Sequence, residues 1–228
     1  MEPLLDRLHR IRERIAAAEK RSGRPAASVQ LLAVTKGFPV GVVREAIALG
    51  LREFGESRVQ EAEGKIASVG AGARWHLVGH LQTNKALRAV QLFDAIHSVD
   101  SERIAAEIAK RATAAGKSPE CFVEVNTSGD AAKFGISPSG ALALWTRLRE
   151  LPPLRPAGFM TIGPLAGGAE GARASFRALA AMREEAIRRG GRESECALSM
   201  GMSDDFEIAV EEGAHLVRIG SALFGERG

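Results

Sequence analysis

The sequence predicts an α/β protein whose parallel sheet closes into a (β/α)8 TIM barrel, with one additional helix at the N-terminus. Apolar, partly β-branched runs of strand length alternate with segments of helical periodicity along the 228 residues. Eight strand candidates occur in this alternation, which predicts βαβ units and a parallel sheet. No long linker or repeat interrupts the pattern, so we expect a single domain over residues 1–228. A doubly wound open sheet is the alternative fold.

The elements are expected in a regular order. The N-terminal helix covers residues 3–22, with Leu4, Leu5, Leu8, Ile11 and Ile15 at helical spacing. Strands are expected at 29–35, 52–55, 75–79, 93–99, 121–126, 157–162, 197–200 and 215–220. The barrel helices are expected at 40–50, 57–68, 84–91, 101–115, 138–150, 169–189 and 204–212. Ser57 is expected to cap the second of these barrel helices.

Composition excludes several classes of function. The 31 basic and 28 acidic residues are interspersed and aromatic residues make up 5%, so we expect no nucleic-acid partner. The five histidines are scattered, and we expect no metal site. The two cysteines lie in apolar runs, as reduced core thiols do. The N-terminus is not a signal peptide and no apolar stretch is long enough to span a bilayer, which predicts a cytoplasmic protein without a membrane partner.

Lys36 is the first residue with chemical potential. In a (β/α)8 barrel the active face lies at the carboxyl ends of the strands, and Lys36 directly follows the first buried strand. Burial lowers the pKa of an amine, and a neutral amine can form a Schiff base with an aldehyde. Strand-end lysines also commonly extend into solvent, and this residue alone does not decide between the two.

The segments after strands seven and eight provide the second feature, because barrels often bind phosphate there. Ser199, Met200, Gly201 and Ser203 follow strand seven, and Ser203 occupies the expected N-cap position of the next helix. Gly220 and Ser221 follow strand eight, adding backbone N–H groups and a hydroxyl. Asp204 and Asp205 would repel a phosphate unless they point away.

Arg218 is the third feature. It lies between Val217 and Ile219 in a buried strand, and a buried guanidinium needs a partner. That partner is either a carboxylate inside the barrel, such as Glu124, or a heteroatom of a ligand.

Together these segments resemble the pyridoxal phosphate homeostasis proteins, the YggS/PROSC family, whose fold is similar to the barrel domain of alanine racemase. The matching stretches run in the family's order almost from end to end. They are Leu32–Lys36, Phe54–Glu56, Trp75–Lys85, Val125–Asn126, Lys133–Gly135, Gly158–Ile162, Leu198–Asp205 and Val217–Ser221. The resemblance implies a fold type III barrel that binds pyridoxal 5′-phosphate (PLP).

The resemblance also assigns expected roles. It implies a Schiff base between Lys36 and PLP, and a contact from Arg218 to the pyridine nitrogen. The residues implied around the phosphate are Ser199, Gly201, Ser203, Gly220 and Ser221, and Met200 is also expected to bind the cofactor. Further residues implied near the cofactor are Ser57, His80, Asn126 and Met160. The chain departs from the family where Ser57 and Arg58 replace the usual Asn-Tyr, and more mildly at Asp130, where Glu is common.

The expected activity is holding PLP rather than catalysis. PLP stabilises a carbanion most strongly when its ring nitrogen is protonated, and an arginine donates to that nitrogen without sharing a proton. Racemisation also needs a second base, which is a tyrosine in alanine racemases, and this sequence contains no tyrosine. We therefore expect a monomeric PLP carrier whose recipients are apo forms of PLP-dependent enzymes. A low-activity amino-acid racemase and a barrel that binds another phosphorylated metabolite are the alternatives.

Overall fold

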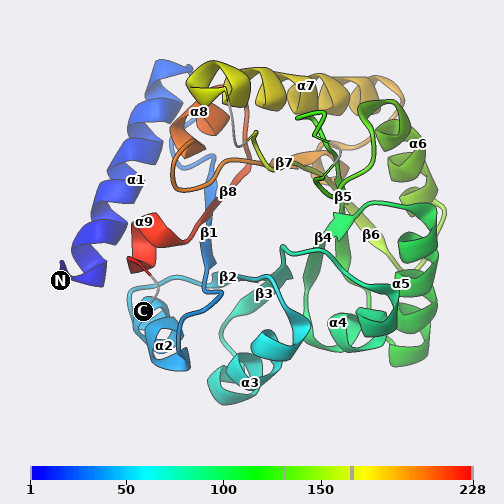
Figure 1. Ribbon diagram of the computed structural model, residues 1–228, viewed down its shortest axis with the longest axis horizontal. Coiled ribbons are helices and arrows are strands. Elements are labelled where there is room, and N and C mark those ends of the chain that lie inside the picture. Colours follow the sequence, from blue (N-terminus) through cyan, green and yellow to red (C-terminus); the bar gives the residue numbers. More distant parts are fainter. Residues whose placement is uncertain (1, 131, 165–166, 227–228) are drawn as a thin grey trace.

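Eight parallel strands form a closed barrel. The computed structural model describes residues 2–130, 132–164 and 167–226. The strands pair in sequence order, and β8 pairs with β1, with Arg218 opposite Leu32 (Figure 1). The strands are β1 (Gln30–Val34), β2 (Glu53–Glu56), β3 (Arg74–Leu77), β4 (Ala95–Val99), β5 (Glu120–Glu124), β6 (Arg155–Met160), β7 (Ala197–Ser199) and β8 (Leu216–Ile219). Closure confirms the predicted barrel and excludes the open sheet.

Helices surround the barrel, one after each strand. The α-helices are α1 (Leu4–Arg21), α2 (Val40–Ala48), α3 (Val59–Val69), α4 (Ala86–Leu92), α5 (Glu102–Ala115), α6 (Pro138–Arg149), α7 (Gly168–Arg188), α8 (Phe206–Glu211) and α9 (Ser221–Phe224). Two 3₁₀ turns, η1 (Thr83–Lys85) and η2 (Glu193–Glu195), precede α4 and β7. No described helix is long and apolar enough to cross a membrane.

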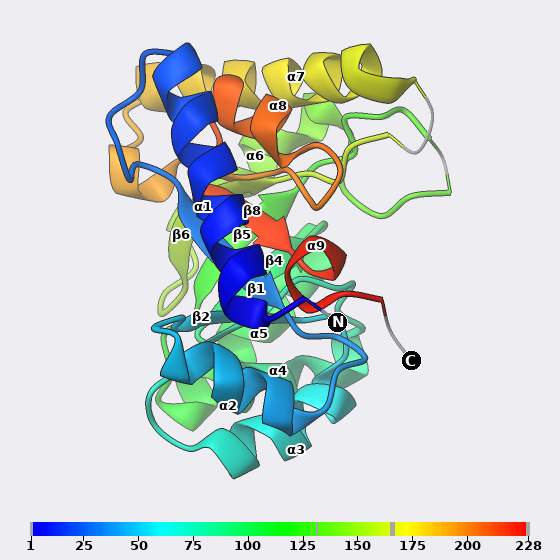
Figure 2. The ribbon, with the colours of Figure 1, turned by 90° about the vertical axis from the view of Figure 1, so that its left-hand side faces the viewer.

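The additional helix α1 packs against α8 and α9, and lies alongside them in Figure 2. Leu4, Leu8, Ile11 and Ile15 are buried, because their spacing places them on one face of the helix. Leu5 lies off that face and is 42% exposed, so its expected place in the apolar stripe is wrong. The apolar face of α1 therefore covers the two helices that follow the predicted phosphate-binding segments.

Several strand bounds and helix ends differ by one or two residues from the predicted ones, and two differences at helix starts affect predicted caps. Ser57 does not cap α3, because that helix begins at Val59 with Arg58 in the cap position. Similarly, α8 begins at Phe206 rather than at residue 204, with Asp205 in the cap position. The short helix α9 after β8 was not predicted, since its four residues are too few for a periodic pattern.

The barrel interior contains polar side chains as well as apolar ones. His76, His97, Ser199 and Arg218, from four different strands, are each at most 4% exposed and are linked by hydrogen bonds. Most of the apolar core instead joins the outer face of the barrel to the surrounding helices, with Phe54, Phe159 and Phe176 among its largest fully buried members. The polar interior leads to the candidate site.

Candidate functional site

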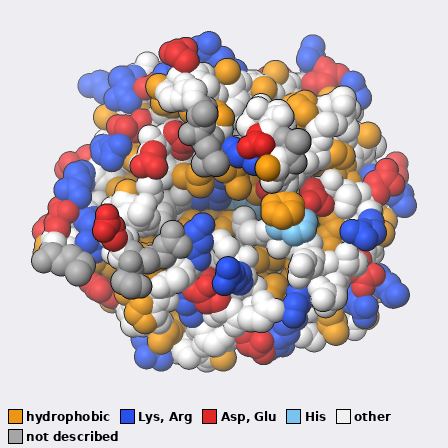
Figure 3. Space-filling view, in the orientation of Figure 1, with side chains coloured by type: hydrophobic (Ala, Val, Ile, Leu, Met, Phe, Trp, Pro, Cys, Tyr) orange, Lys and Arg blue, Asp and Glu red, His pale blue; other side chains and the backbone are white. Residues whose placement is uncertain are grey.

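A cavity of about 530 Å³ opens at the carboxyl ends of the strands. Its polar lining includes Lys36 after β1, Ser203 after β7, Ser221 after β8 and the buried Arg218. This face of the barrel is toward the viewer in Figure 1, and it is hollowed near its middle in the space-filling view (Figure 3). The volume lies within the range of small-molecule sites. Three segments that are far apart in sequence therefore share one concave site.

The amine of Lys36 belongs to this cavity. Val34 and Thr35 before it are buried, whereas Lys36 itself is exposed. Of the two alternatives that the sequence leaves open, the structure therefore shows the exposed lysine. Val34 lies two residues earlier and also lines the cavity, so apolar surface lies beside the lysine.

The segment after β7 is held by a glycine and by a carboxylate. Gly201 has a φ of +90°, and a Cβ on it would lie 2.5 Å from the Cβ of Ala209 in α8. Met202 N–H donates to Asp205 Oδ1 at 2.6 Å, so this carboxylate is bonded to the backbone of its own loop. Burial raises the pKa of Asp205. Asp204 lines the cavity, so the predicted conflict between phosphate and acids concerns Asp204.

Ser203 and Ser221 meet across the cavity edge. Their hydroxyl oxygens are 3.1 Å apart, and Ala222 N–H donates to Ser203 Oγ at 3.2 Å. Ser203 thereby connects the β7 and β8 segments instead of capping α8, which corrects its expected role as a cap. Gly220 lines the cavity beside this pair. The two hydroxyls are donors suited to an anionic phosphate, and the Lys36 amine and the Arg218 guanidinium line the same cavity.

Arg218 is held by backbone carbonyls and a hydroxyl. Nη1 donates to Ser199 O at 2.7 Å and to Ser199 Oγ at 3.0 Å, and Nη2 donates to Thr161 O at 2.8 Å. Burial lowers the pKa of Arg218 to about 10, and the charges of Glu124 and Asp205 oppose that shift. The guanidinium is therefore charged at neutral pH while it faces the cavity.

A series of hydrogen bonds continues from Arg218 through the barrel. Ser199 Oγ is 3.0 Å from His97 Nδ1, His97 Nε2 is 2.9 Å from His76 Nδ1, and His76 Nε2 is 2.5 Å from Glu53 Oε2. Arg218 donates to Ser199 Oγ at one end of the series, and an ionised Glu53 carboxylate only accepts at the other end, so His76 Nε2 carries a proton. Burial lowers the pKa of His97 well below its ordinary value, consistent with a neutral ring.

Of the remaining predicted residues, only Ser57 lines this cavity among the described residues. Ser199 lies behind Arg218, Met200 is buried in the core with its N–H bonded to Leu216 O, and Met160 is buried beside Phe122 and Leu216. Asn126 donates to Asp130 O at 2.7 Å within its own loop. Ser57 lines the cavity, but His80 stacks on Phe134, with ring centroids 3.9 Å apart, beside an adjacent cavity.

Apolar walls of the cavity were not predicted. Phe38, Val78 and Ile162 line it, and each comes from a loop or strand end whose direction the sequence pattern does not define. Val34 could have been found, because strand alternation places it on the side of Lys36. Among the described residues, no group of three potential ligand side chains is arranged to hold a metal ion.

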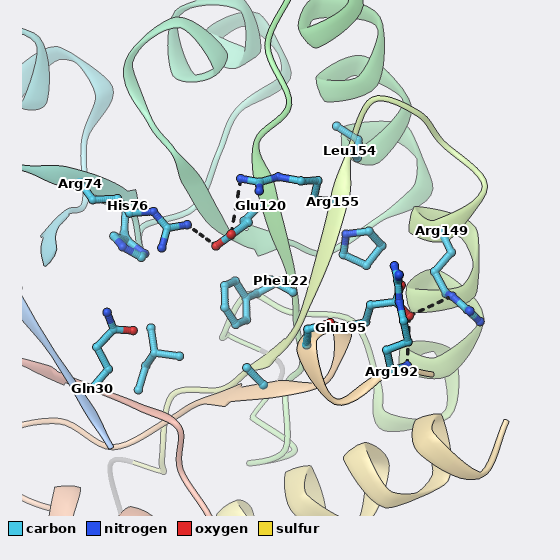
Figure 4. A pocket seen from close by; sticks show the side chains of 15 residues that line it. Gln30, Arg74, His76, Glu120, Phe122, Arg149, Leu154, Arg155, Arg192 and Glu195 are labelled. Carbon is cyan, nitrogen blue, oxygen red and sulfur yellow. Dashed lines mark hydrogen bonds and ion pairs between the residues drawn. The ribbon is translucent and has the colours of Figure 1, made fainter. Parts of the chain in front are cut away.

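A second cavity, of about 610 Å³, lies at the opposite end of the barrel. Arg74 and Arg155 pair with Glu120 on one side, and Arg149 and Arg192 pair with Glu195 on the other, with Phe122 between them (Figure 4). Each of these arginines already has a carboxylate partner. In barrels this face usually serves stability, so we place the candidate site at the Lys36 cavity.

Comparison with known proteins decides the family. A family profile described as alanine racemase, N-terminal domain, matches residues 7–228. The pyridoxal phosphate homeostasis protein of Aquifex aeolicus is 41% identical, covering 97% of this chain and 97% of its own length. This chain belongs to that family. The family protein of Escherichia coli K12 is 35% identical over 100% of this chain and 98% of its own length.

Solved structures agree with this family membership. PipY of Synechococcus elongatus PCC7942, solved with PLP bound, has a TM-score of 0.80 and 38% identity, covering 98% of this chain and 100% of PipY. An unknown protein from Bifidobacterium adolescentis has a TM-score of 0.89 and 37% identity, covering 97% and 94%. Alanine racemase of Clostridium difficile 630 shares the fold, with a TM-score of 0.73 at 15% identity over 93% of this chain and 55% of the racemase.

Proposed function

We propose that this protein binds PLP in the Lys36 cavity and holds it as part of intracellular PLP homeostasis. The observation that supports this function is that Lys36, Ser203, Ser221 and Arg218 line one cavity. PLP, when bound, supplies an aldehyde that condenses with a lysine amine and releases water. A family relative solved with PLP bound supports the same ligand.

Each residue of the cavity has a distinct part in this proposal. Lys36 supplies the amine for covalent attachment, while the hydroxyls of Ser203 and Ser221 and the backbone at Gly220 bind the phosphate. Arg218, fixed by Ser199 and Thr161, donates to the ring nitrogen. Gly201 lets the β7 segment pass close to α8 and so places Ser203.

The same residues favour binding of PLP over catalysis with it. A guanidinium whose pKa is about 10 donates to a ring nitrogen without giving up its proton at neutral pH. Carbanion formation on the ligand is then weakly supported, and the sequence offers no tyrosine as an opposing base. Delivery to apo enzymes, a cytoplasmic location and a monomeric state stay predictions from the sequence.

Borohydride reduction of the PLP-loaded protein, followed by peptide mass mapping, tests the site. We expect one labelled lysine, Lys36, and loss of the label in Lys36→Ala, with residual affinity for pyridoxine 5′-phosphate, which lacks the aldehyde. Lys85→Ala is the control, because Lys85 lines the adjacent cavity. A label on another lysine, or none, contradicts the proposal. α-Deuterium exchange of amino acids above the rate of free PLP would instead establish a racemase-like activity.

A further inference from the structure

A buried lysine lies directly behind the segment that carries Lys36. Lys65, on α3, is 7% exposed and its Nζ donates to Thr35 O at 2.6 Å, Glu56 Oε1 at 2.7 Å and Glu61 Oε1 at 2.7 Å. An ammonium has three N–H donors, so this group is fully saturated. One of its three partners is the carbonyl of the residue that precedes Lys36.

The carboxylates of Glu56 and Glu61 also bond to the residues on either side of Lys36. Glu61 Oε1 also accepts from Gly37 N–H at 2.5 Å, and Gly37 is the residue that follows Lys36. Glu56 Oε1 accepts from Thr35 Oγ1 at 2.6 Å. The backbone on both sides of Lys36 is therefore bonded to the cluster of Glu56, Glu61 and Lys65, while the Lys36 side chain itself is exposed to the cavity.

Stability alone does not account for this cluster. Burying an ion pair costs desolvation, and apolar replacements of buried pairs are often as stable. Glu56 is fully buried, burial raises its pKa, and its Oε2 has no partner among the described residues. Val59 and Ala62 already bury one side of α3 in the apolar core. What the cluster adds is a set of bonds to the peptide groups that flank one exposed amine.

We propose that Lys65, Glu56 and Glu61 are positioning residues that fix the direction in which Lys36 enters the cavity. This inference rests on the proposed function, because it concerns how readily the Lys36 amine attaches covalently to PLP. Small displacements of a reacting group reduce rates strongly, by as much as about 10²-fold for 1 Å. Lys65 itself is saturated and buried, so it does not compete for the aldehyde.

Glu61 offers the cleanest test, because its side chain is 30% exposed and its replacement leaves the apolar core intact. Glu61→Met removes the acceptor for Gly37 and Lys65, whereas Glu61→Gln keeps an oxygen for both. Covalent attachment is followed by stopped-flow absorbance on mixing with PLP, and non-covalent binding by calorimetry with pyridoxine 5′-phosphate. We expect attachment to slow by about tenfold or more in Glu61→Met and to be largely restored in Glu61→Gln, with unchanged pyridoxine 5′-phosphate affinity.

Two further variants separate positioning from folding. Lys65→Met combined with Glu56→Gln removes both buried charges, and thus avoids an unpaired buried carboxylate at Glu56. It also removes the Lys65 donor from Thr35 O, which then keeps only the Phe38 N–H. Glu19→Gln is the matched control, because Glu19 is a buried carboxylate bonded to Ala27 N–H and Val29 N–H, away from the cavity. We expect slow attachment in the double variant and a wild-type rate in Glu19→Gln.

Equal attachment rates in wild type, Glu61→Met and the double variant would overturn the inference. Parallel losses of attachment rate and pyridoxine 5′-phosphate affinity would also overturn it, since they indicate a general loss of structure. A wild-type protein that attaches no PLP at Lys36 would instead refute the proposed function, so the two failures are distinguishable.

Discussion

The hydroxyl of Ser199 points into the barrel rather than into the cavity. It contacts Arg218 Nη1 and His97 Nδ1, both at 3.0 Å. Ser203 and Ser221, by contrast, line the cavity itself. Serines that appear equivalent in the sequence therefore divide into one that supports Arg218 and two that are available to a phosphate.

This division predicts different effects of serine replacement. Ser221→Ala removes a donor to the phosphate, and we expect about tenfold weaker binding of pyridoxine 5′-phosphate by calorimetry. Ser199→Ala removes the partner of buried His97 Nδ1 and one of the two acceptors of Arg218 Nη1, so we expect a loss of about 1–3 kcal/mol in the free energy of unfolding. Its ligand affinity should remain within about threefold of wild type. An affinity loss as large as that of Ser221→Ala would place the phosphate deeper than proposed.

The sequence was sufficient to predict cavity residues whose position follows from the end of a strand. Lys36, Ser203, Gly220 and Ser221 were predicted at the active face, and they line one cavity. The sequence did not predict which way a side chain points, because a residue at a strand end can face either the cavity or the core. Met200 and Ser199 are adjacent in the predicted segment, yet one packs in the core and the other bonds inside the barrel. The partners of Arg218 were also unpredictable, since two of them are carbonyls.

At the scale of elements, α8 is held close to the β7 segment by Gly201. Gly201→Ala meets both an unfavourable φ of +90° and a contact of 2.5 Å with Ala209. We expect a loss of about 3 kcal/mol in urea denaturation, together with weaker phosphate-ester binding because Ser203 shifts. Gly213→Ala, at the other end of α8, has a φ of +99° but its nearest neighbour is 3.8 Å away. In Gly213→Ala the free energy of unfolding should fall by about 1–2 kcal/mol, and the ligand affinity should not change.

The helix α1 provides a second test at this scale. Leu8 is fully buried against the neighbouring helices, whereas Leu5 is 42% exposed. Leu8→Ala should lower the free energy of unfolding by about 3 kcal/mol, and Leu5→Ala by no more than about 0.5 kcal/mol. Equal losses in chemical denaturation would mean that α1 packs with another face.

For the molecule as a whole, Glu124 makes stability depend on pH. Burial, with a contribution from Asp100, raises its pKa from 4.5 to about 7, and Arg218 opposes the shift. The folded protein then binds this proton more tightly than the unfolded chain does. Stability contributed by the protonated carboxyl is complete below pH 4.5 and is lost as pH rises toward 7, by on the order of 3 kcal/mol.

Glu124→Gln isolates this contribution. We expect the variant to be more stable than wild type at pH 8 and similar to it near pH 4, measured by urea denaturation at both pH values. His97 and His215 have lowered pKa values and produce the opposite slope, but they do so in both proteins. A stability difference that is the same at both pH values would show that the Glu124 carboxyl is ionised throughout.

The two imidazoles inside the barrel have a consequence for spectroscopy. His76 and His97 are 1% and 0% exposed, and each ring proton lies between two heavy atoms of the hydrogen-bond series. Water reaches these protons when the strands separate, so their exchange with solvent is limited by separation of the strands. We expect two slowly exchanging imidazole N–H resonances in the NMR spectrum, whose lifetimes report how often the folded barrel comes apart.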